Sequence, residues 1–583
     1  MAAVTYGYRG ANLYIDLTAG RSWREPLTEE VARGYIGSTG ISSKLALDLI
    51  PAGADPLGPE NAVIIGTGPF AGTILPGACR TEITAKSPET GLFGITNSGI
   101  FGPRMKFAGY DHIVLLGRSP RPCYIRIEDD KVFIEEGAPV WGKDIYQATD
   151  WLWERHGTDY DVVCIGPAGE NLVRCANVIG NKHSAFGMCG IGAVLGSKGV
   201  KAVMARGTGD VRVADPARFM GLAKEVFHEL DKHPYVLEWR KWGTLIQFQE
   251  YAPGAREQMQ ALGMDMQAWS KAYETSRFGT NTCPQCPVGC KVDVKVQEGR
   301  HAGLRLVASC PNGGLTSPYV FGMKLPTDRF EDGIWLYSLQ NRLGLGAINF
   351  SALLATAFRM YQAGVITQRD TGGVDLRWGD PEAIAAMMYK VSYRQDIGDV
   401  LADGIPRLLD QLPEAAPYIK FIKKGEPIPF NPTQWPHQPW PKKVGDRFRW
   451  ETTSLGNLVN PSGHIYTRYS SITQMPDRQP DALRRYAQRI GVPREEIERV
   501  VFDRVDGYDP VLITLYTELY HLVGYSLANC NRPYFHKIFD FRRLEGLYRA
   551  ATGLALSFEE MKEAALRIIT VQRLFNLKGG VGN

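Results

Sequence analysis

Three cysteines lie close together near the middle of the chain, at Cys283, Cys286 and Cys290. Thiolates at this spacing can converge on one face of an iron–sulfur cluster, whose fourth ligand then comes from elsewhere in the chain. A zinc site would need a second pair of Cys or His residues at a short distance, and no such pair follows at the usual spacing. A redox-active Cys-x-x-Cys pair is the other alternative. The spacing therefore favours an iron–sulfur cluster.

Two other cysteines are candidates for the fourth ligand. Cys310 is close in sequence, whereas Cys530 ends a distant apolar run. A lone cysteine is more often a small buried apolar residue, so the choice between the two depends on the fold.

Glycine-rich loops are dense in the N-terminal part of the chain. They cover residues 66–72, 97–99, 166–171 and 187–198. Glycine lets backbone N–H groups approach phosphate oxygens closely, and Ser197 and Lys198 add a hydroxyl and a cation. Neither the Gly-x-Gly-x-x-Gly spacing of a dinucleotide fold nor the Walker pattern is present. Tight turns explain any one of these loops, but together they indicate a site for an anionic cofactor.

Length and charge restrict the classes of protein that fit. The chain has 583 residues, 44% hydrophobic and 22% charged, so it can form about three domains with cores of their own. The net charge of +4 is spread over interspersed residues of both signs, which argues against nucleic acid as a partner. We find no signal peptide and no membrane span. The 10 Cys in so long a chain indicate a reducing compartment, the cytoplasm.

The character of the sequence changes once along the chain. Short apolar runs such as 62–66 and 112–117 are bounded by turns and predict strands. From Asp215 onward, longer stretches such as 216–233 and 336–364 have helical periodicity. Ser557 begins a capping box before a further helix.

These patterns predict an α+β fold. The expected domains are a β-rich one at 1–212 and two mainly helical ones at 213–424 and 425–583. A segment rich in Pro and Trp, residues 425–450, is predicted to be a linker or a surface loop.

Six segments, taken in order, carry a resemblance to a known family. They are residues 79–91, which include Arg80, and residues 97–99, 106–111, 165–172, 190–198 and 572–580. Together with the cysteine motif, this order resembles the aldehyde:ferredoxin oxidoreductase family over nearly the whole chain. Members of this family hold tungsten, or sometimes molybdenum, on two pyranopterins beside a [4Fe–4S] cluster.

The resemblance implies both the architecture and the site. A β-rich N-terminal domain with pseudo-twofold halves would hold the bis-pterin, and two helical domains would supply the cluster and a substrate channel. The implied cluster ligands are Cys283, Cys286, Cys290 and Cys530. The implied pterin contacts are Arg80, Asn97, Ser98, Gly99, Gly187, Gly190, Gly192, Lys198, Asn341, Gly344 and Leu345. Arg80 would lie between pterin and cluster, and the Asn97 carbonyl would help to hold a Mg²⁺ that bridges the pterin phosphates.

The sequence departs from the family pattern at three places. Aldehyde oxidisers have paired Asp-x-x-Gly-Leu motifs for the pterin amines, but the first has Asn341 here and the second is reduced to residues 525–530. An Asn still hydrogen-bonds a pterin edge without a charge. Where aldehyde oxidisers have a Glu near the metal, this chain has Cys310. In this respect the chain is similar to branches of the family that have a Cys at this position. They include the tungsten subunit of class II benzoyl-CoA reductase and an uncharacterised enteric branch. Cys310 is either a ligand of the tungsten or molybdenum or a buried structural residue.

His464 is the candidate for proton transfer. Histidine titrates near neutral pH and suits general acid–base chemistry beside a metal-bound oxygen. The surrounding motif is similar to the region where the family has an active-site His, and Tyr466 would be a supporting donor. The alternative is an ordinary loop histidine, one of 10 His in the chain.

The implied activity is two-electron chemistry on a small molecule, by default aldehyde plus water to carboxylate. Electrons would leave through the cluster to a ferredoxin or a ferredoxin-like iron–sulfur subunit. One alternative is a reductase of an activated carboxylate or aromatic acyl-thioester, which Cys310 favours and the lack of a recognisable coenzyme A site disfavours. Another is an electron-transfer subunit without a working pterin site. The substrate, the choice of tungsten or molybdenum, and the state as homo-oligomer or hetero-complex stay open.

Overall fold

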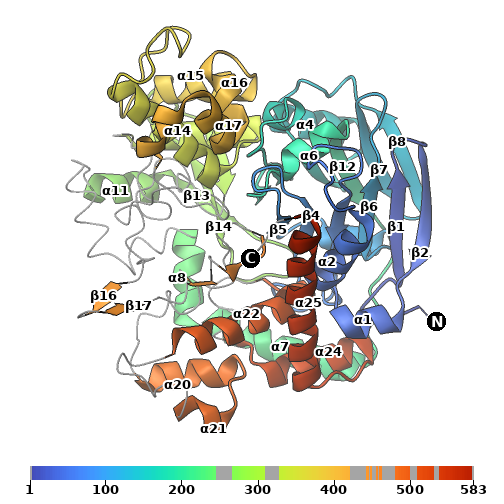
Figure 1. Cartoon of the computed structure of the whole chain (residues 1–583). Coiled ribbons are helices and arrows are strands. Elements are labelled where there is room, and N and C mark those ends of the chain that lie inside the picture. The colour runs from blue at the N-terminus through green and yellow to red at the C-terminus, as the bar shows by residue number, and fades with distance from the viewer. Residues whose placement is uncertain are drawn as a thin grey trace.

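In the computed structural model, the chain begins with a β-rich part and continues with helices that pack back onto it (Figure 1). The structure describes residues 3–243, 266–308, 327, 329–419, 442–444, 447–449, 455–456, 459–462, 480–498, 509–530 and 538–580. Strands followed by helices are the order of the α+β class, which confirms the predicted fold class.

A six-stranded sheet comes first in the chain, with the order β2-β1-β6-β3-β4-β5. Its strands are β1 (Ala11–Asp16), β2 (Arg21–Pro26), β3 (Val63–Gly66), β4 (Thr81–Lys86), β5 (Phe93–Ser98) and β6 (His112–Leu116). β1 and β6 are parallel, and the other neighbours are antiparallel. The continuous apolar run predicted as a strand at 62–66 is β3, whose residues are all buried, as expected for a central strand.

A second six-stranded sheet repeats this topology. Read from the corresponding edge, its order is β8-β7-β12-β9-β10-β11. Its strands are β7 (Cys123–Glu128), β8 (Lys131–Glu136), β9 (Asp161–Ile165), β10 (Val178–Gly180), β11 (Ser184–Phe186) and β12 (Val200–Arg206). β7 and β12 are parallel, like β1 and β6, and the other neighbours are again antiparallel. The two halves share strand order and direction, which confirms the pseudo-twofold N-terminal domain.

One core joins the two sheets. Ile15 and Val63 of the first sheet and Ile125 and Val163 of the second belong to the same cluster of buried apolar residues. The short helices α3 (Gly102–Phe107) and α6 (Ile191–Ser197) add side chains to this core. On the outside, α2 (Ser38–Leu49) packs on β3 and β4, and α4 (Ile145–His156) packs on β9.

The rest of the described chain is mainly helical and contains two small antiparallel sheets. The larger one consists of β13 (Arg277–Asn281), β14 (Lys291–Lys295) and β15 (Arg305–Ala308). The described helices are α7 (Pro216–Lys232), α8 (Pro234–Trp242), α11 (Met266–Ser276), α13 (Phe330–Leu343), α14 (Ala347–Gln362), α15 (Pro381–Ser392), α16 (Ile397–Ala402), α17 (Gly404–Gln411), the 3-10 helix η2 (Pro413–Tyr418), α20 (Pro480–Arg489), α21 (Arg494–Glu496), α22 (Pro510–Ser526), α24 (Phe541–Thr552) and α25 (Phe558–Lys578).

The helix predictions hold except at one break. The stretch 216–233 forms α7, and Ser557 caps α25 in a capping box with Glu560. The predicted helix over 336–364 is two helices, because Gly344 takes a left-handed φ of 77° at the end of α13 and α14 begins at Ala347.

The predicted linker at 425–450 lies mostly outside the described residues. Within it, β16 (Lys442–Val444) and β17 (Arg447–Arg449) form a short hairpin. The domain boundaries at residues 212 and 424 stay predictions. Among the described helices, none has the length and apolar character needed to cross a lipid bilayer.

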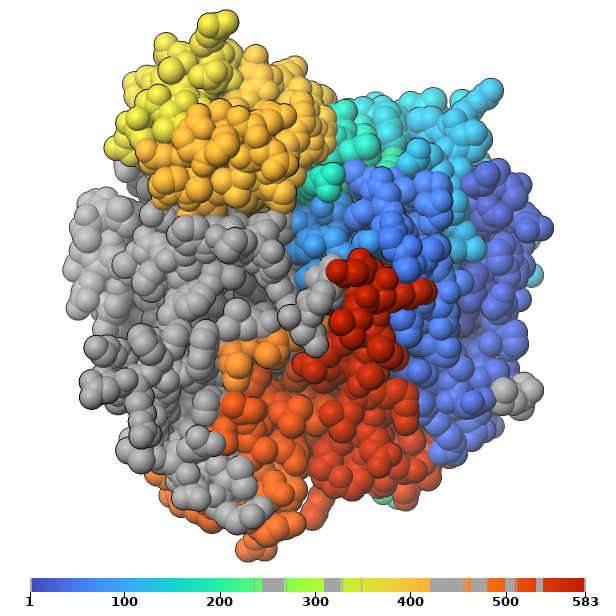
Figure 2. Space-filling view, in the orientation of Figure 1, coloured from blue at the N-terminus to red at the C-terminus, as the bar shows by residue number. Residues whose placement is uncertain are grey.

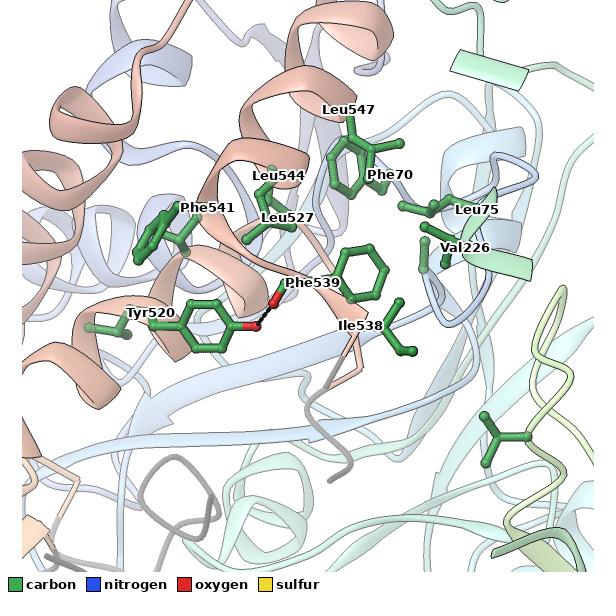
Figure 3. Packing of buried hydrophobic residues seen from close by; sticks show 14 of the residues in the cluster. Phe70, Leu75, Val226, Tyr520, Leu527, Ile538, Phe539, Phe541, Leu544 and Leu547 are labelled. Carbon is green, nitrogen blue, oxygen red and sulfur yellow. Dashed lines mark hydrogen bonds between the residues drawn. The ribbon is translucent and has the colours of Figure 1, made fainter. Parts of the chain in front are cut away.

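The last helices pack on the N-terminal domain. α25 lies along α2, so the C-terminal end of the chain covers part of the half of the N-terminal domain that contains the first sheet (Figures 1 and 2). Phe70, from the loop between β3 and β4, shares a core with Leu527 and Leu544 (Figure 3). In the same core the Tyr520 hydroxyl donates to the Phe539 carbonyl at 2.7 Å. This packing fixes the end of α22 against the β3–β4 loop.

A buried ion pair gives a direct test of the N-terminal fold. Lys106 Nζ donates to Asp111 at 2.8 Å, and the two side chains are 0% and 1% exposed. We expect Lys106→Met to lower the free energy of unfolding by about 3–5 kcal/mol, because it leaves a buried carboxylate without its partner. Lys44→Met removes the cation of the part-exposed Lys44–Asp48 pair and should cost about 0–1 kcal/mol. Equal losses in denaturant titrations of the two variants would contradict this.

Candidate functional site

The three clustered cysteines lie on the loop between β13 and β14. The Cys286 N–H donates to the Cys283 carbonyl at 3.1 Å, which closes a tight turn. Gln285 and Gly289 have φ of 58° and 61°, so two residues of this loop have a left-handed backbone conformation. Cys283 and Cys290 both interact electrostatically with Cys286. The three thiols are therefore near neighbours in space as well as in sequence.

Cys530 joins them from the other end of the chain. In the turn after α22, Ala528 takes a left-handed φ of 65°. The Cys530 N–H donates to the Gly77 carbonyl at 3.0 Å, and the Arg80 N–H donates to the Ala528 carbonyl at 3.1 Å. The Cys530 thiol also interacts electrostatically with Cys286. Backbone of the N-terminal domain therefore holds the fourth expected ligand beside the other three.

A fifth cysteine belongs to the same group, although sequence reasoning did not identify it as a site residue. Cys79 is 1% exposed, and its thiol hydrogen-bonds the Cys283 thiol. It also interacts electrostatically with Cys286 and Cys530. The nine cysteines that the structure describes are all unbridged. The available signal in the sequence was the place of Cys79 directly before Arg80, in a segment that carries the family resemblance.

Within the described ranges, no three Cys, His, Asp or Glu side chains form a group that could hold one metal ion. A four-iron cluster takes one thiolate at each iron, so its ligands surround a larger volume.

Gly99 leaves room for the Cys283 sulfur. A Cβ at this position would lie 2.3 Å from Cys283 Sγ and 3.7 Å from Cys79 Sγ. Because interiors are close-packed, any larger residue at position 99 must displace the first of these thiols. The loop at the end of β5, which was expected to contact the pterin, therefore also borders the cysteine site.

The charges around the thiols differ from one sulfur to the next. The hydrogen bond from Cys79 lowers the pKa of Cys283 to about 5 against the effect of burial, and Lys291 and Arg80 lower it further. Burial, followed by the neighbouring thiols, raises the pKa of Cys286 well above its ordinary value. Cys283 is therefore better prepared than Cys286 to be an anionic ligand before any metal is bound.

Arg80 places a buried cation beside the thiols. Burial alone would lower the pKa of its guanidinium, but Cys530, Tyr525 and Cys79 raise it above its ordinary value. The guanidinium is therefore a permanent positive charge next to the cysteine site. A cation in this place suits a residue between two anionic groups, as the resemblance implies for Arg80.

Three backbone segments meet near the end of β5. Thr96 Oγ1 donates to the Gly187 carbonyl at 2.5 Å, which ties β5 to the loop before α6. The Asn177 N–H donates to the Gly344 carbonyl at 2.7 Å, and its Nδ2 donates to the Leu345 carbonyl at 3.2 Å. The structure thus brings the expected residues Gly187, Gly344 and Leu345 close to one another, since a Cβ on Gly187 would lie 3.8 Å from Asn177 Nδ2. Asn177 is a positioning residue that sequence reasoning missed, because its partners lie far away along the chain.

Gly190 and Gly192 let α6 approach the same backbone. Gly190 precedes α6 with a left-handed φ of 65°, and a Cβ on it would lie 2.0 Å from the Arg174 carbonyl oxygen. The Gly192 N–H donates to the Ala176 carbonyl at 3.0 Å. These two glycines therefore serve close packing, and the Gly192 amide already has a partner in the protein.

Comparison with known proteins decides the family. The model of the aldehyde ferredoxin oxidoreductase N-terminal domain matches residues 12–207, and the model of domains 2 and 3 of the same enzymes matches residues 221–583. The chain belongs to the aldehyde ferredoxin oxidoreductase family. Its relatives of that name are tungsten-containing aldehyde ferredoxin oxidoreductases, and the chain is an oxidoreductase of this family.

Individual relatives show how far this similarity extends. A tungsten-containing aldehyde ferredoxin oxidoreductase of Thermococcus kodakarensis is 33% identical over 99% of this chain and 90% of its own length. The WOR-like subunit of an aliphatic sulfonate oxidoreductase of Pyrococcus furiosus is 30% identical over 69% of this chain and 67% of its own. A chain of the active-site complex BamBC of benzoyl coenzyme A reductase, solved with 1,5-dienoyl-CoA, shares the fold. Its TM-score is 0.76 at 22% identity, with coverage of 99% of this chain and 90% of that one.

The residues present fit the cofactors that the family implies. Four thiols beside a buried cation are a donor set for a [4Fe–4S] cluster. Asn97 and Ser98 end β5, opposite Glu82 and Thr81 of β4, and lead directly to Gly99. The expected pterin contacts on β5 and the expected cluster ligands therefore border each other in this family member.

Two of the expected pterin contacts have partners within the protein. Lys198 Nζ donates to the Gly117 carbonyl at 2.8 Å and the Pro59 carbonyl at 3.1 Å, and burial lowers its pKa to about 8. The Asn341 amide hydrogen-bonds the Tyr146 hydroxyl. Lys198 thus links the end of α6 to two loops, and Asn341 links α13 to α4. Their contacts with a pterin stay predictions.

Three expected catalytic residues lie outside the described residues: Cys310, His464 and Tyr466. The structure does describe the segment that leads to residue 463. Asn576 Nδ2 donates to the Pro461 carbonyl at 2.7 Å, and Asn576 Oδ1 accepts from the Phe93 N–H at 2.7 Å. That segment is therefore anchored between α25 and the first residue of β5.

We expect Gly99→Ala to weaken cluster binding, because the new Cβ would displace the Cys283 sulfur. Protein purified anaerobically should hold clearly fewer than four irons per chain and lose most of its visible iron–sulfur absorbance. Gly279→Ala is the matched control, since Gly279 lies in β13 near the cysteine loop and no atom is within 4 Å of a Cβ built there. Full iron content in Gly99→Ala would show that Cys283 is not held against residue 99.

Proposed function

We propose that this chain binds a [4Fe–4S] cluster through Cys283, Cys286, Cys290 and Cys530, beside a bis-pterin that carries tungsten or molybdenum. The supporting observation is the convergence of the 283–290 loop and Cys530 next to the buried cation Arg80. A zinc site does not require a buried guanidinium beside its thiols, whereas the positive charge of Arg80 suits an electron relay next to an anionic cofactor.

The duplicated sheets support two pterins rather than one. β5 in the first sheet leads into Gly99, and its counterpart β11 in the second sheet leads into Gly187. The two strands lie against each other, and the Thr96–Gly187 hydrogen bond joins them. Equivalent glycine loops from the two halves suit the two pterins of a single cofactor, with backbone N–H groups as donors to anionic oxygens.

The chain's own residues would supply position and electrostatics. The pterin-bound metal supplies the two-electron chemistry when it is present. Arg80 would hold anionic groups on both sides of its guanidinium, and the Asn97 carbonyl would help to hold a Mg²⁺ at the pterin phosphates. His464 would accept and release a substrate proton, with Tyr466 as a hydrogen-bond donor. The anchor between Asn576 and Pro461 supports this assignment, because it fixes the backbone just before the His464 segment.

The reaction we propose is aldehyde oxidation. An aldehyde and water give a carboxylate, three protons and two electrons, and a cluster held by Cys283, Cys286, Cys290 and Cys530 would carry the electrons away one at a time. The names of the relatives, tungsten-containing aldehyde ferredoxin oxidoreductases, support both the substrate class and a ferredoxin-like acceptor. The relatives that are subunits of complexes support a dedicated iron–sulfur subunit as an alternative acceptor.

Cys310 favours a second candidate, a reductase of an aromatic acyl-thioester or another activated carboxylate. The residue follows β15 directly after Ser309, where aldehyde oxidisers are expected to have a carboxylate near the metal. A thiolate there would favour a lower-valent metal. The fold shared with a chain of the benzoyl coenzyme A reductase complex is compatible with this reaction.

Metal analysis and turnover together test the proposal. We expect anaerobically purified protein to contain four irons, one tungsten or molybdenum and two pterins per chain. Reduction of a viologen dye that depends on added aldehyde would support the first reaction. Oxidation of reduced dye that depends on an aromatic acyl-thioester would support the second. Stoichiometric zinc without iron would contradict both.

A further inference from the structure

The sulfur of Cys283 has two hydrogen-bond donors that are not expected cluster ligands. The Cys79 thiol and the Lys291 ammonium both hydrogen-bond this sulfur. Both thiols lie close to Gly99, since a Cβ built there would be 2.3 Å from Cys283 Sγ and 3.7 Å from Cys79 Sγ. Lys291 is 5% exposed and Cys79 is 1% exposed, so water does not compete for these contacts.

Both donors are held by the backbone of rigid elements. Cys79 stands between Ala78, which bridges to Asn529, and Arg80, whose N–H donates to the Ala528 carbonyl. This arrangement leaves the Cys79 side chain little freedom to turn away from the cysteine site.

Lys291 is fixed in the same way from the opposite side. It begins β14, where it pairs with Asn281 of β13. Its Nζ lies 3.2 Å from Nδ1 of His183, in the turn between β10 and β11. Burial and Lys291 lower the pKa of His183 to about 3, so the imidazole is neutral and its Nδ1 can accept from the ammonium. The ammonium is therefore held between the Cys283 sulfur and the second sheet.

Donors to a cluster sulfur change the energy of the two redox states unequally. Reduction adds negative charge to the cluster and its thiolates, so a hydrogen bond or a nearby cation stabilises the reduced state more than the oxidised state. Among the described contacts, Cys283 combines an S–H donor, an ammonium and the nearby guanidinium of Arg80. Contacts at the Cys283 sulfur would therefore favour the added electron.

We propose that Cys79 and Lys291 are positioning residues that raise the reduction potential of the cluster through the Cys283 sulfur. The inference rests on the proposed cluster and goes beyond it, because neither residue is a ligand.

Anaerobic redox titration of the holoprotein, followed by EPR of the reduced cluster, tests this inference. We expect Cys79→Ala and Lys291→Met each to lower the midpoint potential while iron stays at four per chain. Cys79→Ser keeps a donor and should stay close to the parent. Lys295→Met is the matched control, because Lys295 is the exposed last residue of the same strand, and its loss should leave the potential unchanged.

Several outcomes would overturn the inference. Unchanged potentials in both Cys79→Ala and Lys291→Met would show that the two contacts do not influence the cluster. An equal shift in Lys295→Met would mean a general effect of charge rather than a contact at Cys283. Loss of iron in Cys79→Ala would make Cys79 a ligand. A parent protein without any iron–sulfur signal would instead refute the proposed function, and the two failures are therefore distinguishable. If Lys291→Met does not fold, the difference in midpoint potential between Cys79→Ala and Cys79→Ser decides whether the inference holds.

Discussion

Two backbone hydrogen bonds hold the opposite ends of this chain together at the cysteine site. The Cys530 N–H donates to the Gly77 carbonyl, and the Arg80 N–H donates to the Ala528 carbonyl. Buried backbone groups must be paired, so these bonds fix both segments where no side-chain rotamer can loosen them. The buried apolar core around Phe70 packs against the same junction (Figure 3). The place of Cys530 and Arg80, and with it the composition of the site, follows from this junction.

The duplicated sheets provide the other side of the site. Their equivalent strands β5 and β11 meet, and the glycines that follow them, Gly99 and Gly187, lie at the ends of the two strands. Gly99 then contacts the cysteine loop, which comes from a different part of the chain. Because one loop borders both halves of the site, the proposed cofactor binding in the N-terminal domain and the proposed cluster binding at the cysteine loop would depend on each other. This coupling gives a physical reason for glycine at position 99.

Local sequence patterns predicted the features that depend on interactions within a few residues. The cysteine loop, β3, α7 and the capping box of α25 depend on spacing and periodicity within a few residues. The break at Gly344 was missed although a left-handed glycine is a local signal that ends a helix. The hydrogen bonds from Asn177 to residues 344 and 345 hold this turn in place.

The parts of the site that local patterns did not predict depend on contacts between segments that are distant in sequence. Cys530 was predicted as a site residue only from the family resemblance. Cys79 was missed as a site residue because its partner Cys283 is distant in sequence. Lys198 looked like a phosphate ligand in a glycine-rich loop, but its ammonium has carbonyl partners that no sequence pattern marks. Cys310, His464 and Tyr466 stay predictions, since they lie outside the described residues.

The central claim is that thiols from the middle and the end of the chain surround one iron–sulfur cluster against the N-terminal domain. Anomalous diffraction at the iron edge from anaerobic crystals tests it most directly. The account predicts a single compact group of iron peaks enclosed by the sulfurs of Cys283, Cys286, Cys290 and Cys530, with Cys79 close by but not bonded to iron. Iron peaks that exclude Cys530, or a zinc-edge signal at the cysteine loop in their place, would contradict it.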